Sequence, residues 1–211
     1  MTEKLSKHKE VDAWYRYPQY RKWFNKLYVA DHLGYLCGPA GVPVPKSGDY
    51  VVRPIYNLAG MGVGAKIIYI VPEDIAAVPP GNFWVERFVG THYSVDYVRK
   101  DGKFEQYYCY IGVNSPDNLS RFYSWTRSDH KFTLPESIAN IDVPRLNIEA
   151  IDDKIIEVHL RNGFDNVMQY ESIIPVFENQ YEKDMAGYTY IEHVADGLGW
   201  LTNKRLGYFV K

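Results

Sequence analysis

The chain of 211 residues is long enough for one domain with a sizeable core or for two small lobes. Its composition, 46% hydrophobic and 24% charged, is that of a globular protein, and the net charge of −2 argues against a polyanion such as DNA as the main partner. No stretch has the length of a membrane span, and the charged N-terminal residues contain no apolar run of the kind a signal peptide has, so we expect none. Cys37 and Cys109 lack metal spacing and are expected to be free thiols. We therefore expect a soluble, cytoplasmic protein that binds neither nucleic acid nor a membrane.

Helical spacing marks the first part of the chain. After a polar start, apolar residues recur at helical intervals from residue 13 to residue 36, with a break at Pro18. This pattern predicts one short and one longer helix. Glycines and prolines end the helical region, and residues 42–45 read as an extended connector.

A cation at the end of a strand comes next. Residues 50–53 predict a strand that ends in Arg53, and residues 66–71 predict its hairpin partner. The loop between them contains Gly60, Gly62 and Gly64. Glycines let backbone N–H groups approach anionic oxygens, so the stretch suits a phosphate. A glycine-rich hairpin without a ligand is an equally open interpretation.

The clearest sheet signal follows. Residues 83–89, 93–99 and 103–113 predict an antiparallel meander, with a type I′ turn at Asp101-Gly102. Many of the 19 Tyr, 9 Phe and 5 Trp lie in such alternating runs, which favours a large share of sheet. Residues 115–142 are polar and irregular, with basic residues among aromatic ones. Such a loop can cover a nucleotide, but a solvated surface connection is the favoured interpretation.

A second chemical stretch lies in the next hairpin, residues 146–151 and 154–161. On a strand, Glu157, His159 and Arg161 share one face, while the apolar residues 156, 158 and 160 pack on the other. Such a face can hold a metal ion and the phosphate that it bridges. Plain alternation on a half-solvated strand explains the same pattern. Beyond it, residues 167–176 predict a helix or a strand, and residues 197–199 a turn.

Taken in order, these motifs resemble those of the ATP-grasp superfamily over residues 20–165. Val52-Arg53-Pro54 with the glycine loop resembles its phosphate-binding strand and loop, residues 85–96 its hinge, and residues 157–161 its metal-binding strand. Upstream, Asn25-Lys26-Leu27 and residues 41–45 resemble its first helix and connector. The resemblance implies an α+β fold of two small lobes with antiparallel sheets and a nucleotide cleft between them. We expect an N-terminal helical segment (1–45), a small lobe (46–82), a main lobe (83–180) and a C-terminal extension (181–211).

The resemblance also implies a set of site residues. Those expected to bind ATP are Lys26, Arg53, Gly60, Gly62, Gly64, Val85, Glu86, Phe88 and His92. Those expected to act in catalysis are Arg53 and Arg161, and those expected to bind Mg²⁺ are Asn147, Glu157 and His159.

Several of these residues depart from the family's pattern. Arg53 stands in the place of a lysine and His92 in that of a ribose-binding glutamate. Asn147 stands in the place of a metal-binding carboxylate, although Glu149 is close, and His159 in that of an asparagine. An imidazole in the ligand set makes Mn²⁺ a second candidate.

Three functions follow from this pattern. The first is an ATP-dependent ligase that joins a carboxylate to an amine or thiol through an acyl-phosphate. The second is a degenerate ATP-grasp domain that binds nucleotide or acts as a scaffold without ligation. The third is an unrelated structural protein whose tyrosine-rich strands serve assembly. The acceptor substrate, and whether the chain forms a homo-oligomer or binds a protein partner, stay open.

Overall fold

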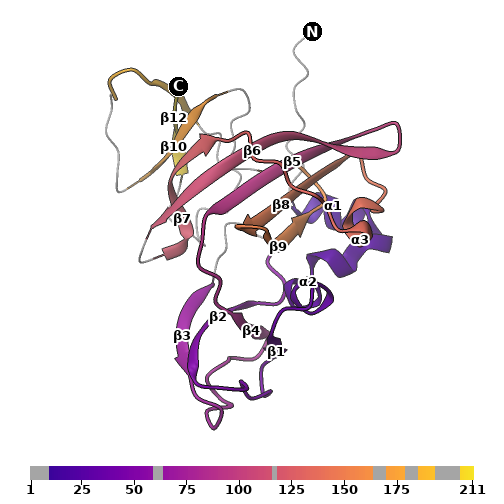
Figure 1. Cartoon of the computed structure of the whole chain (residues 1–211). Coiled ribbons are helices and arrows are strands. Elements are labelled where there is room, and N and C mark those ends of the chain that lie inside the picture. The colour runs from indigo at the N-terminus through magenta and orange to yellow at the C-terminus, as the bar shows by residue number, and fades with distance from the viewer. Residues whose placement is uncertain (1–9, 59–63, 116–117, 164–169, 179–184, 193–204) are drawn as a thin grey trace.

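The computed structural model describes residues 10–58, 64–115, 118–163, 170–178, 185–192 and 205–211. They form two antiparallel sheets and a group of short helices, which confirms the expected α+β fold. Figure 1 shows the large sheet across the molecule, the small sheet below it and the helices along one side. Within these residues, no helix has both the length and the apolar character needed to cross a membrane.

A four-stranded sheet in the order β1-β4-β2-β3 forms the small lobe. Its strands are β1 (Cys37–Pro39), β2 (Gly48–Pro54), β3 (Lys66–Ile70) and β4 (Asn82–Glu86). The expected hairpin of β2 and β3 is confirmed. The expected meander over residues 83–113 is confirmed for its second and third strands, which pair as β5 and β6. Its first strand is wrong, because β4 ends at Glu86 and pairs with β1 and β2. Both faces of β4 are buried, with Trp84 against Tyr50 and Phe83 near Ala30, which explains its central place.

An eight-stranded sheet in the order β11-β12-β10-β7-β6-β5-β8-β9 forms the large lobe. Its strands are β5 (His92–Lys100), β6 (Lys103–Ser115), β7 (Asn118–Arg127), β8 (Arg145–Ile151), β9 (Lys154–His159), β10 (Ser172–Phe177), β11 (Thr189–Glu192) and β12 (Arg205–Val210).

The turn between β5 and β6 has the predicted form. Asp101 and Gly102 have φ of 47° and 78°, as a type I′ turn requires. The irregular connection expected over residues 115–142 is partly wrong, because β7 lies within it. The β6–β7 register shifts twice, between Val113 and Asn114 and between Asn114 and Ser115, and such bulges break the alternation by which a strand is recognised. The turn expected at residues 197–199 lies outside the described residues.

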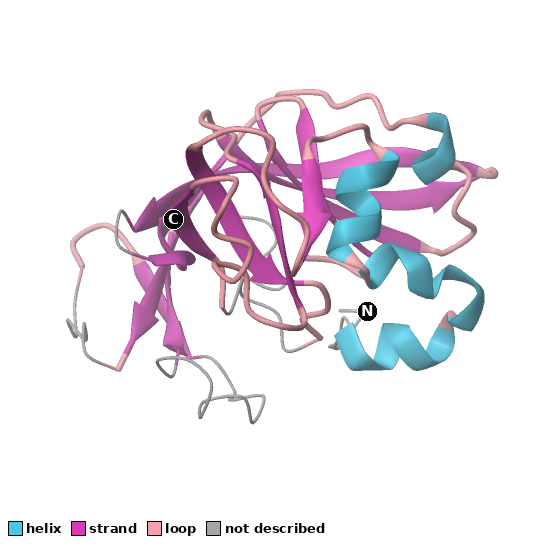
Figure 2. Ribbon diagram, turned by 90° about the horizontal axis from the view of Figure 1, so that it is seen from below, coloured by secondary structure: helices cyan, strands magenta, loops and turns pink. Residues whose placement is uncertain are grey.

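The helical elements are α1 (Glu10–Arg16), the 3-10 helix η1 (Pro18–Phe24), α2 (Lys26–His32) and α3 (Glu136–Ala139). The expected break at Pro18 is confirmed. A second break occurs at Asn25, whose side-chain oxygen accepts a hydrogen bond from Tyr28 N (2.8 Å) and caps α2. Figure 2, seen from below, shows the helices gathered on one side of the sheets.

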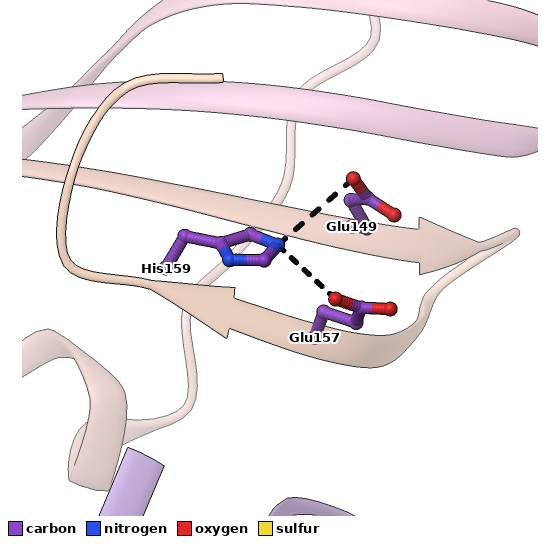
Figure 3. A group of neighbouring side chains, drawn as sticks. All are labelled: Glu149, Glu157 and His159. Carbon is purple, nitrogen blue, oxygen red and sulfur yellow. Dashed lines mark ion pairs between the residues drawn. The ribbon is translucent and has the colours of Figure 1, made fainter. Parts of the chain in front are cut away.

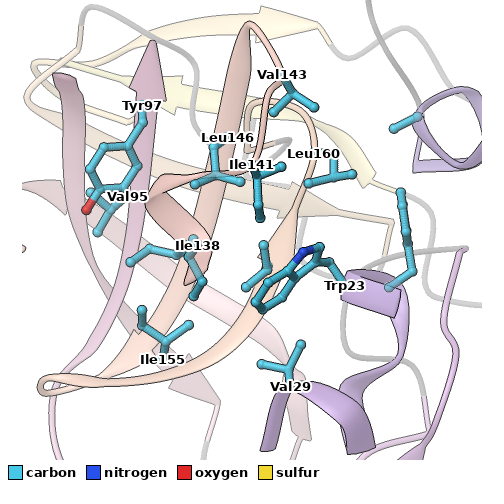
Figure 4. Packing of buried hydrophobic residues seen from close by; sticks show 14 of the residues in the cluster. Trp23, Val29, Val95, Tyr97, Ile138, Ile141, Val143, Leu146, Ile155 and Leu160 are labelled. Atoms are coloured by element: carbon cyan, nitrogen blue, oxygen red, sulfur yellow. The ribbon is translucent and has the colours of Figure 1, made fainter. Parts of the chain in front are cut away.

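The helices and the large sheet share the main core. Trp23 and Val29 pack into a cluster with Leu146 of β8, and the residues around α3 contribute Ile138 and Ile141 (Figure 4). The strand positions in this core, all nearly inaccessible, are Val95 and Tyr97 of β5, Leu146 and Ile148 of β8, and Ile155 and Val158 of β9. Because side chains alternate along a strand, the core determines which residues of β5, β8 and β9 point the other way.

The segment that connects the two sheets is fastened to the β8–β9 turn. Asp152 accepts a hydrogen bond from Thr91 N through Oδ1 (2.9 Å), and Asp152 N donates to Thr91 O (2.8 Å). The neighbouring Gly90 has no room for a Cβ, which would overlap the Asp152 carboxylate. The chain therefore enters β5 clamped to the tip of the hairpin formed by β8 and β9.

Candidate functional site

Polar residues cover the face of β5, β8 and β9 that points away from the main core. The register places Ser94 beside Glu149 and Glu149 beside Glu157. The set consists of His92, Ser94 and Asp96 of β5, Asn147 and Glu149 of β8, and Glu157 and His159 of β9, followed by Arg161. All except Glu149, which is half-buried, are buried, so this is an enclosed charged site and not a solvated strand surface.

A bulge alters the alternation expected for β9. The register shifts between Glu149 and Ala150, so that Ala150 pairs with Ile155 and Ile156 is the extra residue. Ile155 therefore packs in the core in place of Ile156, which is half-buried. The shared side of Glu157 and His159 is unaffected, because the bulge precedes both.

Glu157 is the meeting point of two cations from different parts of the chain. Lys26, the first residue of α2, pairs with Glu157 Oε2, and Arg53, near the end of β2, pairs with Oε1. Burial lowers the pKa of Lys26, and the nearby charge of Arg53 lowers it further. Burial also lowers the pKa of Arg53 to about 10, against the opposing charge of Glu149. Helix α2 and the small sheet thus each supply a cation to one carboxylate of the large sheet.

Glu149, Glu157 and His159 form a group suited to a metal ion. One potential ligand atom from each lies within 4.8 Å of the other two. His159 Nε2 lies 3.2 Å from Glu157 Oε2 and 3.9 Å from Glu149 Oε1 (Figure 3). Burial raises the pKa of Glu149, but hydrogen bonding and charge from His92, whose Nε2 is 3.4 Å away, lower it overall. Two carboxylate oxygens and one imidazole nitrogen fit a divalent cation such as Mn²⁺, and Mg²⁺ less well.

Glu10 is a site residue that the sequence analysis missed. It is the first residue of α1 and is 4% exposed. Its Oε1 lies 3.1 Å from His159 Nδ1, and its Oε2 pairs with Arg161 Nε. Burial raises the pKa of Glu10, but the charges of Arg161 and His159 outweigh burial and lower it to about 2. A glutamate in a charged N-terminal run gives no sequence signal of this kind.

Asn147 and Asp96 form a hydrogen-bonded pair beside this cluster. Asn147 Nδ2 donates to Ser94 Oγ (3.0 Å), Val95 O (3.3 Å) and Asp96 Oδ1 (2.9 Å). Asp96 Oδ1 also accepts from Gly163 N (2.8 Å). Asp96 is fully buried, although it is the polar residue between Val95 and Tyr97 of β5. The role of Asn147 as a metal ligand stays a prediction, and Glu149 is the carboxylate that joins Glu157 and His159.

The other described residues predicted to contact the nucleotide lie in the small sheet or its β2–β3 loop, in the segment after the sheet and at the start of β5. Gly60 and Gly62 lie outside the described residues, and Gly64 has φ of 84° beside Pro54. Val85 is buried in β4, and Phe88 contacts the Tyr35 ring at 4.9 Å. The carboxylate of Glu86 accepts a hydrogen bond from Leu36 N (3.0 Å), so it holds the start of β1. His92 contacts the rings of Phe122 and Trp125 at 4.8 and 5.9 Å.

The fold is similar to that of several solved structures. An N5-carboxyaminoimidazole ribonucleotide synthetase in its ADP complex and the N5-carboxyaminoimidazole synthetase of Staphylococcus aureus with ADP each match with a TM-score of 0.54 and 10% identity, over 90% of this chain and 67% of theirs. The biotin carboxylase domain of the Hydrogenobacter thermophilus 2-oxoglutarate carboxylase, with MgADP, ADP and bicarbonate, matches with a TM-score of 0.52 and 9% identity, over 90% of this chain and 62% of that one.

These similarities concern the fold and not the whole length of the other proteins. The chain spans only 41% of an L-amino acid ligase from Bacillus licheniformis, with 13% identity, a TM-score of 0.47 and 67% of this chain covered. It therefore spans about two fifths to two thirds of these proteins. No protein-family model matches the sequence, and no curated protein does.

Proposed function

The chain has the ATP-grasp fold, and on that premise we propose that it is an ATP-dependent ligase that activates a carboxylate as an acyl-phosphate. The observation that carries this proposal is the convergence of Lys26, Arg53 and Glu157 in one buried cluster. Enzymes that transfer phosphoryl groups work mainly by positioning the reactants and neutralising charge. A cluster of cations, carboxylates and an imidazole supplies both.

The cations of the cluster are proposed to bind the phosphates. In the chain alone, the charges of Lys26, Arg53 and Arg161 are balanced by those of Glu10, Glu149 and Glu157. Phosphates bound here would offer Lys26 and Arg53 new anionic partners. A divalent cation would offer Glu157 a new cationic partner in their place. Nucleotide and metal should therefore bind together, since each relieves the charge that the other leaves uncompensated.

Glu149, Glu157 and His159 are proposed to hold the metal ion. When bound there, such an ion would help to neutralise the charge that develops on the phosphate oxygens during transfer. The imidazole of His159 favours Mn²⁺ over Mg²⁺, which prefers oxygen ligands. Mg²⁺ stays the alternative, with Asn147 as a further oxygen donor.

Arg161 is proposed to stabilise the reacting groups. A substrate carboxylate oxygen attacks the γ-phosphorus, ADP leaves, and a carboxylic-phosphoric anhydride forms. An amine or thiol then adds to the acyl carbon and displaces inorganic phosphate. The guanidinium of Arg161 suits the oxyanion of this second step, because its N–H groups donate to two oxygens at once.

A second function is favoured by one observation. Glu157 is held by Lys26 and Arg53 in a closed set of ion pairs that needs no ligand to balance its charge. A chain of this kind could serve as a nucleotide-binding or interaction module without ligation. The free thiols of Cys37 and Cys109 fit a reducing compartment, and we propose the cytoplasm for either function.

Calorimetric titration of ATP and ADP, with Mg²⁺, with Mn²⁺ and with EDTA, tests binding. The ligase proposal predicts binding that depends on the metal. No binding under any condition would refute the ligase and the nucleotide-binding module, and would leave only an interaction module. Hydroxylamine then separates the two, because it converts an acyl-phosphate into a stable hydroxamate. Release of ADP and formation of hydroxamate from a mixture of carboxylic acids would support the ligase. Tight binding without either product would favour the binding module.

A further inference from the structure

Glu10 contacts the one nitrogen of the His159 ring that does not face the carboxylates of the proposed metal site. Nδ1 lies 3.1 Å from Glu10 Oε1, while Nε2 faces Glu157 Oε2 at 3.2 Å and Glu149 Oε1 at 3.9 Å. We propose that Glu10 is a positioning residue, which holds His159 with the proton on Nδ1 and the lone pair of Nε2 directed at the metal. This inference rests on the proposed function.

The argument begins with the chemistry of imidazole. A ring nitrogen binds a metal ion only through its lone pair, so a metal on Nε2 leaves the single ring proton on Nδ1. That N–H needs an acceptor from the protein, because His159 is only 7% exposed and is shielded from bulk water. The carboxylate of Glu10, itself 4% exposed, is the acceptor within hydrogen-bond distance. A carboxylate in this position fixes both the tautomer and the orientation of the ring.

The second oxygen of Glu10 keeps the carboxylate in place. Oε2 pairs with Arg161 Nε, so the two oxygens hold two different groups of the site. The ion pair with Arg161 favours the ionised form of the Glu10 carboxylate, which accepts the proton of His159 Nδ1. Arg161 lies two residues after His159, just beyond the end of β9, and the Glu10 carboxylate contacts both.

Helix α1 thereby becomes part of the site. Glu10 is its first residue, and Ala13, one turn later, is buried in the main core with Trp23. The core contact sets the rotation of α1, and the rotation brings Glu10 over β9. The N-terminal segment, polar in sequence, supplies an anion that a histidine ligand needs for its orientation.

The test compares Mn²⁺ affinity by the electron paramagnetic resonance signal of the free ion, using the full chain and Mn²⁺ alone. In Glu10→Gln, a side-chain amide can face Nδ1 as a donor and drive the ring proton to Nε2. We expect affinity about ten- to a hundredfold weaker than in the wild type. Asp12→Asn removes an exposed carboxylate from the same helix and should leave the affinity unchanged.

A second background separates positioning from general stability. In His159→Gln, a carbonyl oxygen can stand near the place of Nε2, but a methylene replaces Nδ1 and has nothing to donate to Glu10. Adding Glu10→Gln to His159→Gln should then cause no further loss of affinity. An equal loss in both backgrounds would overturn the inference, because Glu10 would act through Arg161 or through the fold. If Glu10→Gln does not fold, Glu10→Asp is the alternative. Its shorter side chain keeps the negative charge but moves it away from His159 Nδ1, so its Mn²⁺ affinity should also be weaker than that of the wild type.

The two proposals fail in different ways. If the wild-type chain binds no Mn²⁺, the proposed metal site is refuted and the inference falls with it. If the wild type and Glu10→Gln bind Mn²⁺ equally, the metal site stands and only the role of Glu10 is refuted.

Discussion

Replacing Asp96 by asparagine should change how the stability of the protein depends on pH. The Asp96 carboxyl is fully buried, and among the described residues its Oδ2 has no hydrogen-bond partner. Burial raises its pKa from 3.8 to about 6, although the hydrogen bonds from Gly163 and Asn147 oppose the change. The folded protein therefore keeps this proton over a range of pH in which the unfolded chain has lost it.

The size and sign of the effect follow from that difference. At about 1.4 kcal/mol for each pKa unit, a pKa of about 6 in place of 3.8 corresponds to roughly 3 kcal/mol of unfolding free energy. Below pH 4 both states hold the proton and Asp96 carries no penalty. Between about pH 4 and pH 6 the unfolded chain ionises first, so the wild type loses this stability as the pH rises. Asparagine has no carboxyl proton, so the variant does not lose this stability as the pH rises.

Urea denaturation of the wild type and Asp96→Asn, followed by tryptophan fluorescence at intervals from pH 4 to pH 8, measures the effect. The variant's unfolding free energy, relative to the wild type, should rise by roughly 3 kcal/mol across this range. Any hydrogen bond that asparagine gains or loses adds the same amount at every pH and does not alter the rise. Asp74→Asn, at an exposed position, controls for the loss of a carboxylate. A difference that is constant, or that falls with pH, would refute the reasoning.

Three further substitutions test the site and the sheet. Arg53→Ala should weaken ATP binding by about 1.5–3 kcal/mol in calorimetric titration, since a charge-assisted hydrogen bond to phosphate is lost. An effect within error would mean that Arg53 has a structural role only. Glu157→Gln should abolish the metal dependence of nucleotide binding, and it should lower the unfolding free energy by about 3–5 kcal/mol because Lys26 and Arg53 stay buried without their counter-charge. Unchanged metal dependence would remove Glu157 from the metal site. Gly112→Ala should cost about 1–3 kcal/mol, because an added Cβ would lie 2.6 Å from the Trp125 ring, and an unchanged urea midpoint would contradict that packing.

Features set by neighbouring residues were predictable from the sequence. The Asp101-Gly102 turn depends on two residues that adopt positive φ, and the structure has both. The strand side shared by Glu157 and His159 follows from alternation, which a strand cannot avoid. The order of motifs also indicated the ATP-grasp fold before any strand pairing was known.

Features set by distant parts of the chain were not predictable in the same way. The partners of β4 are β1 and β2, and its central residues, Trp84 and Val85, pair with residues more than thirty positions earlier in the chain. Adjacency in sequence wrongly suggested that β4 pairs with β5. In the sequence, Asp96 looks like the polar, solvent-facing residue of an alternating strand. It is buried because distant parts of the chain, among them Asn147 and Gly163, pack against that face of the sheet. Glu10 reaches His159 across 149 positions of sequence, a distance over which residue pattern carries no information.

The clamp between Asp152 and Thr91 fixes the point at which the chain from the small sheet enters the large one. Because Thr91 is tied to the β8–β9 turn on both its N–H and its carbonyl, it is attached to the hairpin that carries Glu157. Arg53 belongs to the small sheet and Glu157 to the large one, and the two form an ion pair. Any displacement of one sheet from the other at these residues would have to separate the two charges. A ligand that takes over the charge of Arg53 would remove that resistance.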